Sequence, residues 1–298
     1  MMCADENNME LNKRKFQLLQ HGKNEELKQP YKTGKISLMK ENDVKDLGVY
    51  LSEDMSWETQ MSEAIKKARK FSGWILRWFI SRTPDVLMYL YQSYVLPRVE
   101  YGSLLWSPYQ KKSIIKLEAI QRTMTAKIDG MQKYNYHQRL HKLKLYSLQR
   151  RRERFIAIYM YKLSEGIVPN NLQMKFYVTR RQERKCQLPK LNASMAHLST
   201  IRLNFFTSTG PAIYNLLPAN LKEARSLDSF KHLLDTFLKK IPDLPPTPGY
   251  PSLNKNTLLE WVTGSYNYAE VITMLAAGGT EVEIQQSGQG AEVHPYGS

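Results

Sequence analysis

Residues 147–166 read SLQRRRERFIAIYMYKLSEG and predict a helix with one apolar face and one basic face. Its apolar side chains recur at helical spacing and are expected to be buried: Leu148, Phe155, Ile156, Tyr159 and Leu163. The serine that opens this segment is suited to cap the helix, and the final glycine is suited to end it. Arg150, Arg151 and Arg154 would project from the opposite face, where guanidinium groups could bind phosphates with two hydrogen bonds each.

Three more helices are predicted upstream of this segment. Residues 57–82 place a stripe of apolar side chains on one face: Met61, Ile65, Ala68, Phe71, Ile75, Trp78 and Phe79. The sequence TPD at 83–85 starts a second helix, which is expected to end before Pro97. The sequence SP at 107–108 opens a third helix with this buried side: Ile114, Leu117, Ile120, Met124 and Ile128.

The first part of the chain is predicted to be strands rather than helix. Up to about Ser52, strand-like runs at 14–20, 35–39 and 44–51 are separated by glycine and proline. Residues 170–210 are polar, basic and poorly periodic, so they are expected to form a loop or a flexible crossing. The fold class predicted from these patterns is mainly α-helical with a small N-terminal β remnant, α+β overall.

The last third of the chain contains one more clear amphipathic helix. It lies at 226–243, within which the helix itself is placed at 226–241, with these residues facing inward: Leu227, Phe230, Leu234, Phe237 and Leu238. The proline-rich run at 242–251 is expected to end the helix or act as a linker. After Trp261 there is no Lys or Arg, but there are four Glu and many Gly, Gln and Ser, so a flexible tail is expected. The segments predicted in this way are 1–53, 54–169, 170–261 and 262–298.

The positive charge is concentrated in one part of the sequence. The chain has 298 residues with 43 Lys+Arg and 28 Asp+Glu, a formal net charge of +15. Residues 109–190 alone carry that whole surplus, and the rest of the chain is balanced. A basic block without compensating acids repels itself, and a polyanionic partner relieves that repulsion. The charge therefore favours nucleic acid as the partner over a merely solvated surface.

Several other classes of protein are disfavoured by the sequence. Two cysteines are too few for a disulfide scaffold or a cysteine-rich zinc domain. The start, MMCADENNME, lacks a signal pattern, and the apolar run at 73–80 is far shorter than the roughly 18 residues of a membrane span. No phosphate-binding loop, G-x-S-x-G or adjacent Asp pair is present. We therefore expect an intracellular protein with no membrane partner and no small-molecule substrate.

Two histidines and several aromatic residues raise further possibilities. His137 and His141 lie four residues apart, but no HExxH motif or cysteine pair accompanies them, so phosphate contact or surface exposure is favoured over a metal. Cys3 and Cys186 are isolated and are expected to be ordinary thiols. Tyrosines alternate with cations in a mixture that single-strand binders use: Tyr134, Tyr136 and Tyr146 among Lys133, Arg139, Lys142 and Lys144. Four other rings lie on apolar helix faces and are expected to be core: Trp74, Trp78, Tyr91 and Tyr94.

Several segments of the chain follow one another in a characteristic order: FQLLQHGKN (16–24), VKDLGVYLSEDMSW (44–57), GWILRWF (73–79), LYQSYVLPRVEYGSLLWSP (90–108), KLEAIQRTMTAKI (116–128), RLHKLKLYSLQRRRERFIAIYMYKLSEG (139–166) and GPAIYNLLPANLKEARSLDSFKHLLDTFLKKIPD (210–243). The order and spacing of these segments resemble the end of a LINE-type (non-LTR) retrotransposon reverse transcriptase. The resemblance covers roughly residues 8–261. It implies that residues 1–53 are the end of a palm, that 54–169 are a thumb-like domain, and that 170–261 are a C-terminal extension.

The resemblance also implies what this chain lacks. Polymerases of this family transfer nucleotides with two metal ions held by palm aspartates, and those motifs lie upstream of the matched part. No catalytic residue carries over, so we expect no enzymatic activity and no Mg²⁺ or other cofactor. The thumb of the family grips the template–primer duplex through its backbone, which agrees with the basic block.

Two functions remain open from the sequence. The first is a truncated reverse-transcriptase-like protein that binds RNA, DNA or RNA–DNA hybrid, through these residues: Lys111, Lys112, Lys116, Arg122, Lys144, Arg150, Arg151, Arg154, Arg180, Arg181 and Lys185. The second is a retrotransposon relic or a protein-interaction module with no nucleic-acid role. The arginine cluster around 150–154 also matches a basic nuclear-localisation pattern, which slightly favours the nucleus over the cytoplasm.

Overall fold

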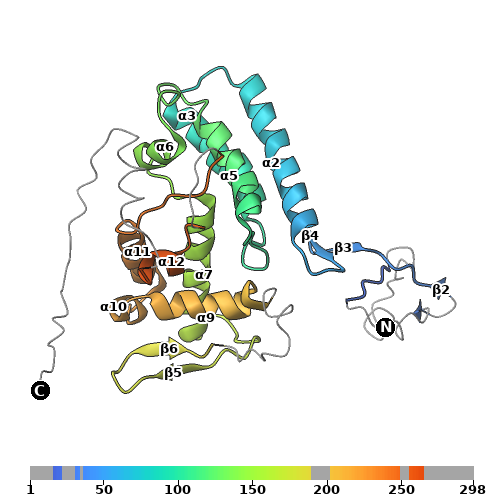
Figure 1. Cartoon of the computed structure of the whole chain (residues 1–298), viewed down its shortest axis with the longest axis vertical. Helices are drawn as coiled ribbons and strands as arrows, with labels where there is room; N and C mark the ends of the chain where they lie inside the picture. The colour runs from blue at the N-terminus through green and yellow to red at the C-terminus, as the bar shows by residue number, and fades with distance from the viewer. Residues whose placement is uncertain (1–15, 22–30, 34–35, 189–201, 249–254, 265–298) are drawn as a thin grey trace, which may run out of the picture.

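A computed structural model describes residues 16–21, 31–33, 36–188, 202–248 and 255–264 of the chain (Figure 1). Within these residues the fold is mainly α-helical with short antiparallel strand pairs, which confirms the predicted α+β class. The first strands lie at the foot of the long helix α2 (Glu58–Trp78), and a further hairpin, at residues 176–186, lies at the lower end of the molecule in Figure 1. The predicted tail at 262–298 falls almost wholly outside the described residues, as does Cys3.

The N-terminal β part consists of two small hairpins. Their strands are β1 (Lys32–Thr33), β2 (Ile36–Ser37), β3 (Asp43–Asp46) and β4 (Val49–Ser52). The prediction of a single strand at 44–51 is therefore wrong in detail, because the chain turns back at Leu47 and Gly48. These two residues have φ angles of 44° and 87°, as a tight hairpin turn with right-handed twist requires. Of the strand predicted at 14–20, the described part forms one isolated bridge, between Leu18 and Lys40.

The first group of helices forms one hydrophobic core. Its members are α2 (Glu58–Trp78), α3 (Pro84–Leu90), the π-helical turn η3 (Tyr91–Val95), α4 (Leu96–Glu100) and α5 (Lys111–Thr125). The predicted buried side of the 107–128 helix is confirmed at all five positions: Ile114, Leu117, Ile120, Met124 and Ile128. These side chains and those of the other helices in the group enclose an apolar interior that includes the fully buried Trp106.

The helix that starts at Pro84 was predicted to end before Pro97, and this prediction is wrong. The backbone N–H of Leu96 bonds to the carbonyl of Tyr91, five residues back, so the hydrogen-bond pattern changes register just before the proline. Pro97 then lies at the start of α4, where a missing backbone N–H costs little. The helical path therefore continues to Glu100.

The second group of helices surrounds α7. Its members are α6 (Tyr136–Lys142), α7 (Leu148–Ser164), α9 (Phe206–Leu216), α10 (Ala219–Lys222), α11 (Leu227–Leu238) and α12 (Leu258–Val262). The Ser147 cap is confirmed, since its side chain accepts a hydrogen bond from the backbone of Arg150 at 3.0 Å. The hydrophobic interior divides within α7: Leu148 belongs to the first core and Ile156 onward to the second. This division does not coincide with the boundary predicted after residue 169.

The segment predicted as a loop at 170–210 is partly ordered, which corrects that prediction. It contains the antiparallel strands β5 (Phe176–Val178) and β6 (Arg184–Cys186), and the start of α9. Asn215 of α9 holds β6 by accepting from the backbone N–H of Cys186 and donating to its carbonyl, both at 2.8 Å. Residues 189–201 lie outside the described part of the chain.

Gly102 connects the β3–β4 hairpin to the helices and offers a test of this packing. Its φ is +68°, and a Cβ there would lie 3.2 Å from Val49 and 3.5 Å from Trp106. Gly102→Ala is therefore expected to lower the free energy of unfolding by about 1–2 kcal/mol, measured by urea denaturation. Gly73→Ala is the matched control, because Gly73 is helical with nothing within 4 Å. The control is expected to stabilise the protein by about 0.5–1 kcal/mol, and a loss equal to that of Gly102→Ala would contradict this account.

Candidate nucleic-acid interface

The three arginines predicted to face outward on α7 are the largest correction that the structure makes. Arg150 is fully buried, with 0% of its surface exposed, and Arg151 and Arg154 are only partly exposed. Each guanidinium group has a partner within the protein. They are therefore not free to bind phosphates in this conformation.

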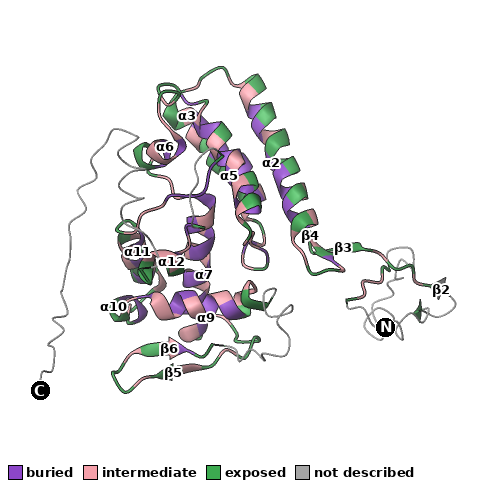
Figure 2. Ribbon diagram, in the orientation of Figure 1, coloured by how far each residue is buried: buried purple, intermediate pink, exposed green. Residues whose placement is uncertain are grey.

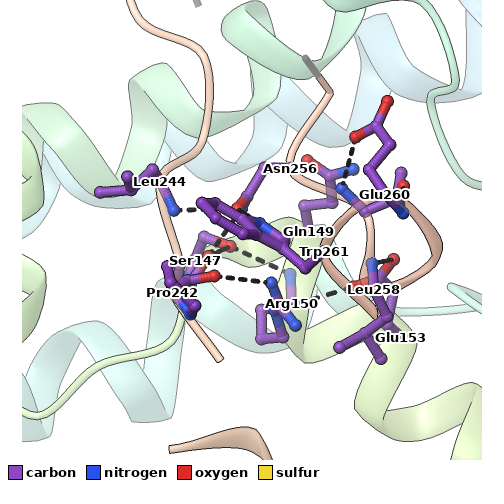
Figure 3. Close-up of polar contacts among 12 residues, drawn as sticks. Ser147, Gln149, Arg150, Glu153, Pro242, Leu244, Asn256, Leu258, Glu260 and Trp261 are labelled. Atoms are coloured by element: carbon purple, nitrogen blue, oxygen red, sulfur yellow. Dashed lines mark hydrogen bonds and ion pairs between the residues drawn. The ribbon is translucent and has the colours of Figure 1, made fainter. Parts of the chain in front are cut away.

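Arg150 holds the chain beyond α11 against the start of α7 (Figure 3). Its Nη2 donates to the carbonyl oxygen of Pro242 at 3.0 Å, and its Nε lies 3.7 Å from a carboxylate oxygen of Glu153. Glu153 in turn accepts a hydrogen bond from the backbone N–H of Leu258 at 2.8 Å. The arginine thus connects two segments that are about a hundred residues away in sequence.

The proline-rich run predicted as a terminator or linker is packed against the same site. Asp243 accepts hydrogen bonds from both the backbone N–H and the hydroxyl of Ser147, at 2.7 Å each. Asn256 donates to the same carboxylate at 2.7 Å and accepts from the indole of Trp261 at 2.9 Å. A carboxylate at the start of α7 is also stabilised by the helix dipole. Residues 244–247 are buried, so the description of this part as a linker is wrong.

The other two arginines form forked ion pairs with neighbouring helices. Arg154 binds Asp235 of α11 through Nε and Nη2, at 2.6 and 2.7 Å. Arg151 binds both carboxylate oxygens of Glu100 at the end of α4. Bidentate pairs of this kind fix geometry as well as charge. Arg151 and Arg154 therefore join α7 to the helices on either side of it.

The predicted cations of α5 are accessible to solvent, unlike those of α7, because they lie on the outer face of the helix. Lys112 and Lys116 are exposed, and Lys111 and Arg122 are partly exposed. Lys127, which was not among the predicted site residues, extends the same row. Lys112 and Lys116 share one face of α5 because they are four residues apart, and Lys127 lies in the turn that follows the end of the helix at Thr125. Only Lys112 of this row has an ion pair among the described residues, an exposed one with Glu58.

Lys144 lies beyond α6, in a separate group of cations and rings. It is exposed with a φ of 52°, and it follows Lys142, whose ammonium lies 4.4 Å from the ring centre of Tyr134. Lys133 lies over the same ring at 5.3 Å. Although desolvation acts to raise it, hydrogen bonding by Lys142 and the charge of Lys133 leave the pKa of Tyr134 below its usual value.

The remaining predicted residues lie on the β5–β6 hairpin, at the lower end of the molecule in Figure 1. Arg180 and Arg181 are exposed at its turn. Lys185 is partly buried, pairs with Glu183 at 3.1 Å and donates to the carbonyl of Asn215 at 3.2 Å. The structure therefore does not bring the eleven predicted residues together on one surface. It separates an α5 row, a group near α6 and the hairpin.

A basic face on α2 was missed from the sequence. From residue 66 to its end, the helix carries Lys66, Lys67, Arg69, Lys70 and Arg77, all exposed, and no acidic residue. The count by blocks hid this face, because acidic residues elsewhere in the balanced part of the sequence cancel it. The signal was available in the helical spacing: all five positions fall outside the buried stripe of Met61, Ile65, Ala68 and Ile75.

Three of the four rings predicted as core are exposed, which is a second correction. Trp74, Trp78 and Tyr94 have exposed fractions of 45%, 67% and 42%. Tyr91 alone is buried, and its hydroxyl donates to the side chain of Gln121 at 2.7 Å. The rings of α2 are left outside because its neighbours cover only the central stripe of the helix.

The two candidate metal or reactive groups support no catalytic role. His137 is partly buried, 2.9 Å from the carbonyl of Pro245, and burial lowers its pKa. Cys186 is buried, and burial raises the pKa of its thiol to about 11. Among the described residues, no group of three or more His, Cys, Asp or Glu is placed to hold a metal ion. No helix of the described residues is long and apolar enough to cross a lipid bilayer.

One buried carboxylate couples the two helix groups to pH. Glu118 of α5 accepts from the hydroxyl of Tyr136 at 2.6 Å and from the backbone of Gln149 at 3.0 Å. Burial nevertheless raises its pKa to about 7. Between its unfolded value, about 4.5, and 7, the folded chain keeps a proton that the unfolded chain has lost. This group therefore makes stability fall as the pH rises through that window.

Replacing Glu118 with glutamine should remove that pH dependence. From pH 5 to pH 7, we expect the free energy of unfolding of the parent to fall relative to Glu118→Gln, by at most about 1.4 kcal/mol per pH unit. Chemical denaturation of both proteins at several pH values measures this difference. Parallel profiles for the two proteins would show that Glu118 does not titrate in this range.

Comparison of this chain with protein-family models, curated proteins and solved structures finds no match.

Proposed function

We propose that this chain binds nucleic acid through the phosphate backbone, without sequence specificity, at a surface formed by α2 and α5. We define the α2–α5 surface by six residues: Lys66, Arg69, Arg77, Lys112, Lys116 and Lys127. An RNA–DNA hybrid or another duplex is the expected ligand, in keeping with the resemblance to the thumb of a LINE-type reverse transcriptase.

The observation that carries the proposal is the side-by-side placement of the two basic rows. The pair between Lys112 and Glu58, at 3.7 Å, joins the starts of the two helices. At the other end, the backbone N–H of Asp129 donates to the carbonyl of Arg82 at 2.9 Å. The helices therefore run parallel, and Arg69, eleven residues after Glu58, lies on the same side of α2 as that glutamate.

The dimensions of this surface suit a duplex backbone. The helix α5 has 15 residues, Lys111–Thr125, which corresponds to a length of about 22 Å. That length equals about six base-pair steps of 3.4 Å. Two acidic residues, Glu58 and Glu63, lie at the first turns of α2 and pair weakly with exposed lysines. At the far end, Asp129 is exposed two residues after Lys127, so one acidic residue lies beside the cations there as well.

Fluorescence anisotropy of the full chain with a labelled RNA–DNA hybrid tests the proposal. We expect binding whose log K falls linearly with log salt, with a slope of about −0.9 for each phosphate neutralised. A slope that corresponds to several neutralised phosphates would support binding through the phosphate backbone. A folded, monodisperse protein that binds weakly or without salt dependence would overturn the proposal.

A protein-interaction module is the second candidate, and a cleft supports it. The cleft measures about 930 Å³ and lies between α4, α7 and the start of α9. It is lined mainly by apolar side chains, among them Tyr101, Leu104, Leu105, Phe155, Tyr159 and Phe206. Apolar concavities of this size are common at binding sites. If the affinity for the hybrid depends only on the charged residues, the cleft takes no part in nucleic-acid binding and remains a candidate site for a protein partner.

A further inference from the structure

We propose that Trp74, Trp78 and Tyr94 form a platform on which unpaired bases of a bound nucleic acid stack. We call these three residues the aromatic platform. The inference rests on the proposed function, because it adds a single-strand site beside the α2–α5 surface. It also names the chemical class that the site takes, which is a run of unpaired nucleotides continuing from a duplex.

The three rings lie together on one flank of α2. Trp78 is one helical turn beyond Trp74, and Tyr94 of η3 lies across from them, with its ring centre 6.2 Å from that of Trp74. Phe79 holds Trp74 from another side, edge to face at 5.7 Å. Rings fixed by such contacts lose little conformational entropy when a base stacks on them.

The exposure of these rings is not a by-product of core packing. The contacts between α2 and its neighbours are made by buried side chains such as Ile75, Val95 and Leu96. Roughly half of each platform ring remains in contact with solvent. Clustered apolar surface of this kind on a soluble fold marks a contact site more often than chance.

The charge around the platform selects a polyanion as its partner. Lys67 and Lys70 lie on α2 on the same side as Trp74, within two turns, and Arg98 extends from α4. The guanidinium of Arg98 lies 3.3 Å from the ring centre of Phe71, and it also donates to the carbonyl of Tyr94. Residues 64–84 contain no Asp or Glu. Aromatic faces with a cationic rim are the combination that single-strand binders use.

The platform adjoins the surface proposed to hold the duplex. Arg77 of the α2–α5 surface directly precedes Trp78 in the last turn of α2. Trp74 and Arg69 lie on opposite flanks of the same helix, because five residues turn the chain by one full revolution and about 140° more. A strand that leaves a duplex on one flank of α2 can therefore pass over the helix end to reach the rings.

The decisive experiment compares three ligands of equal duplex length in anisotropy titrations with the full chain. These are a blunt RNA–DNA hybrid, the hybrid with a tail of about six unpaired nucleotides, and the same tail with abasic sugars. The abasic tail keeps the phosphates and removes the bases. We expect the base-bearing tail to bind about 10-fold tighter or more than the abasic tail. Tryptophan fluorescence should be quenched only by the base-bearing tail.

Variants assign that gain to the rings. Trp74→Ala and Trp78→Ala should each remove most of the gain of the base-bearing tail and leave blunt-hybrid affinity unchanged. Trp74→Phe should keep most of it, because the ring remains. Ile80→Ala is the matched control: Ile80 is the most exposed apolar side chain nearby, at 93%, but it has no ring. Thermal unfolding of each variant shows whether the fold is kept.

The outcomes separate this inference from the proposed function. Equal affinity for base-bearing and abasic tails, or tryptophan variants that keep the full gain, would overturn the platform while leaving the duplex grip in place. Loss of binding to anionic vesicles in the tryptophan variants, with tail binding unchanged, would also overturn it and identify a membrane surface. Base-dependent tail binding without any blunt-hybrid binding would support the platform and overturn the proposed function.

Discussion

Replacing Arg150 with alanine is expected to lower the free energy of unfolding by about 3–5 kcal/mol. The side chain is fully buried, and above pH 7, the approximate value to which burial raises the pKa of Glu153, its loss leaves a charged carboxylate buried beside no cation. The carbonyl of Pro242 loses its donor at the same time. Leaving one partner of a buried pair uncompensated costs far more than the pair itself contributes. Urea denaturation followed by circular dichroism measures the change.

Two further variants show that the effect comes from the buried pair. Arg180→Ala removes an exposed arginine and is expected to change stability by no more than about 0.5 kcal/mol. Combining Arg150→Met with Glu153→Gln removes both charges and should recover a large part of the loss. If Arg150→Ala instead kept full stability and weakened hybrid binding, the arginine would be a phosphate contact, as the sequence pattern suggested.

The helices could be predicted from the sequence because their signals are local. The stripe of α5 follows from residues three or four apart, and the caps at Ser147 and Ser226 need only the next three residues. Such patterns depend on the backbone geometry of one turn. They hold whatever the helix packs against.

The roles of the α7 arginines could not be predicted because their partners are remote. Arg150 meets Pro242, 92 residues away, and Arg154 meets Asp235, 81 residues away. A helical pattern shows only that such residues lie outside the apolar stripe of the helix. Whether that side of the helix meets water or another helix depends on tertiary packing, and α7 is covered on nearly all sides (Figure 2).

On α2, exposed rings were predicted to be buried, again because burial depends on tertiary packing. Apolar character suggested that Trp74 and Trp78 were core, but neighbours cover only a central stripe of this helix. The sequence shows that a ring is apolar and cannot show which flank of the helix is left open.

The second large effect is expected on hybrid binding, when three lysines on and directly after α5 are replaced. Replacing Lys112, Lys116 and Lys127 together with glutamine should reduce the salt slope of hybrid binding by about 2.7, which is 0.9 for each lost phosphate contact. The same loss should weaken binding at about 0.1 M salt by roughly 100-fold or more. The three side chains are exposed, so the fold should be unaffected. Anisotropy titrations at several salt concentrations give both values.

A variant of equal charge at the other end of the molecule distinguishes a binding surface from general attraction. Lys175, Arg180 and Arg181 are exposed on and beside the β5–β6 hairpin, and their replacement with glutamine removes the same three charges. If the α2–α5 surface holds the backbone, this variant keeps the parent slope, because counterions are released only where phosphates are neutralised. Equal losses in both variants would mean that net charge alone attracts the hybrid. A loss confined to the hairpin variant would move the interface there, onto residues that the sequence also favoured.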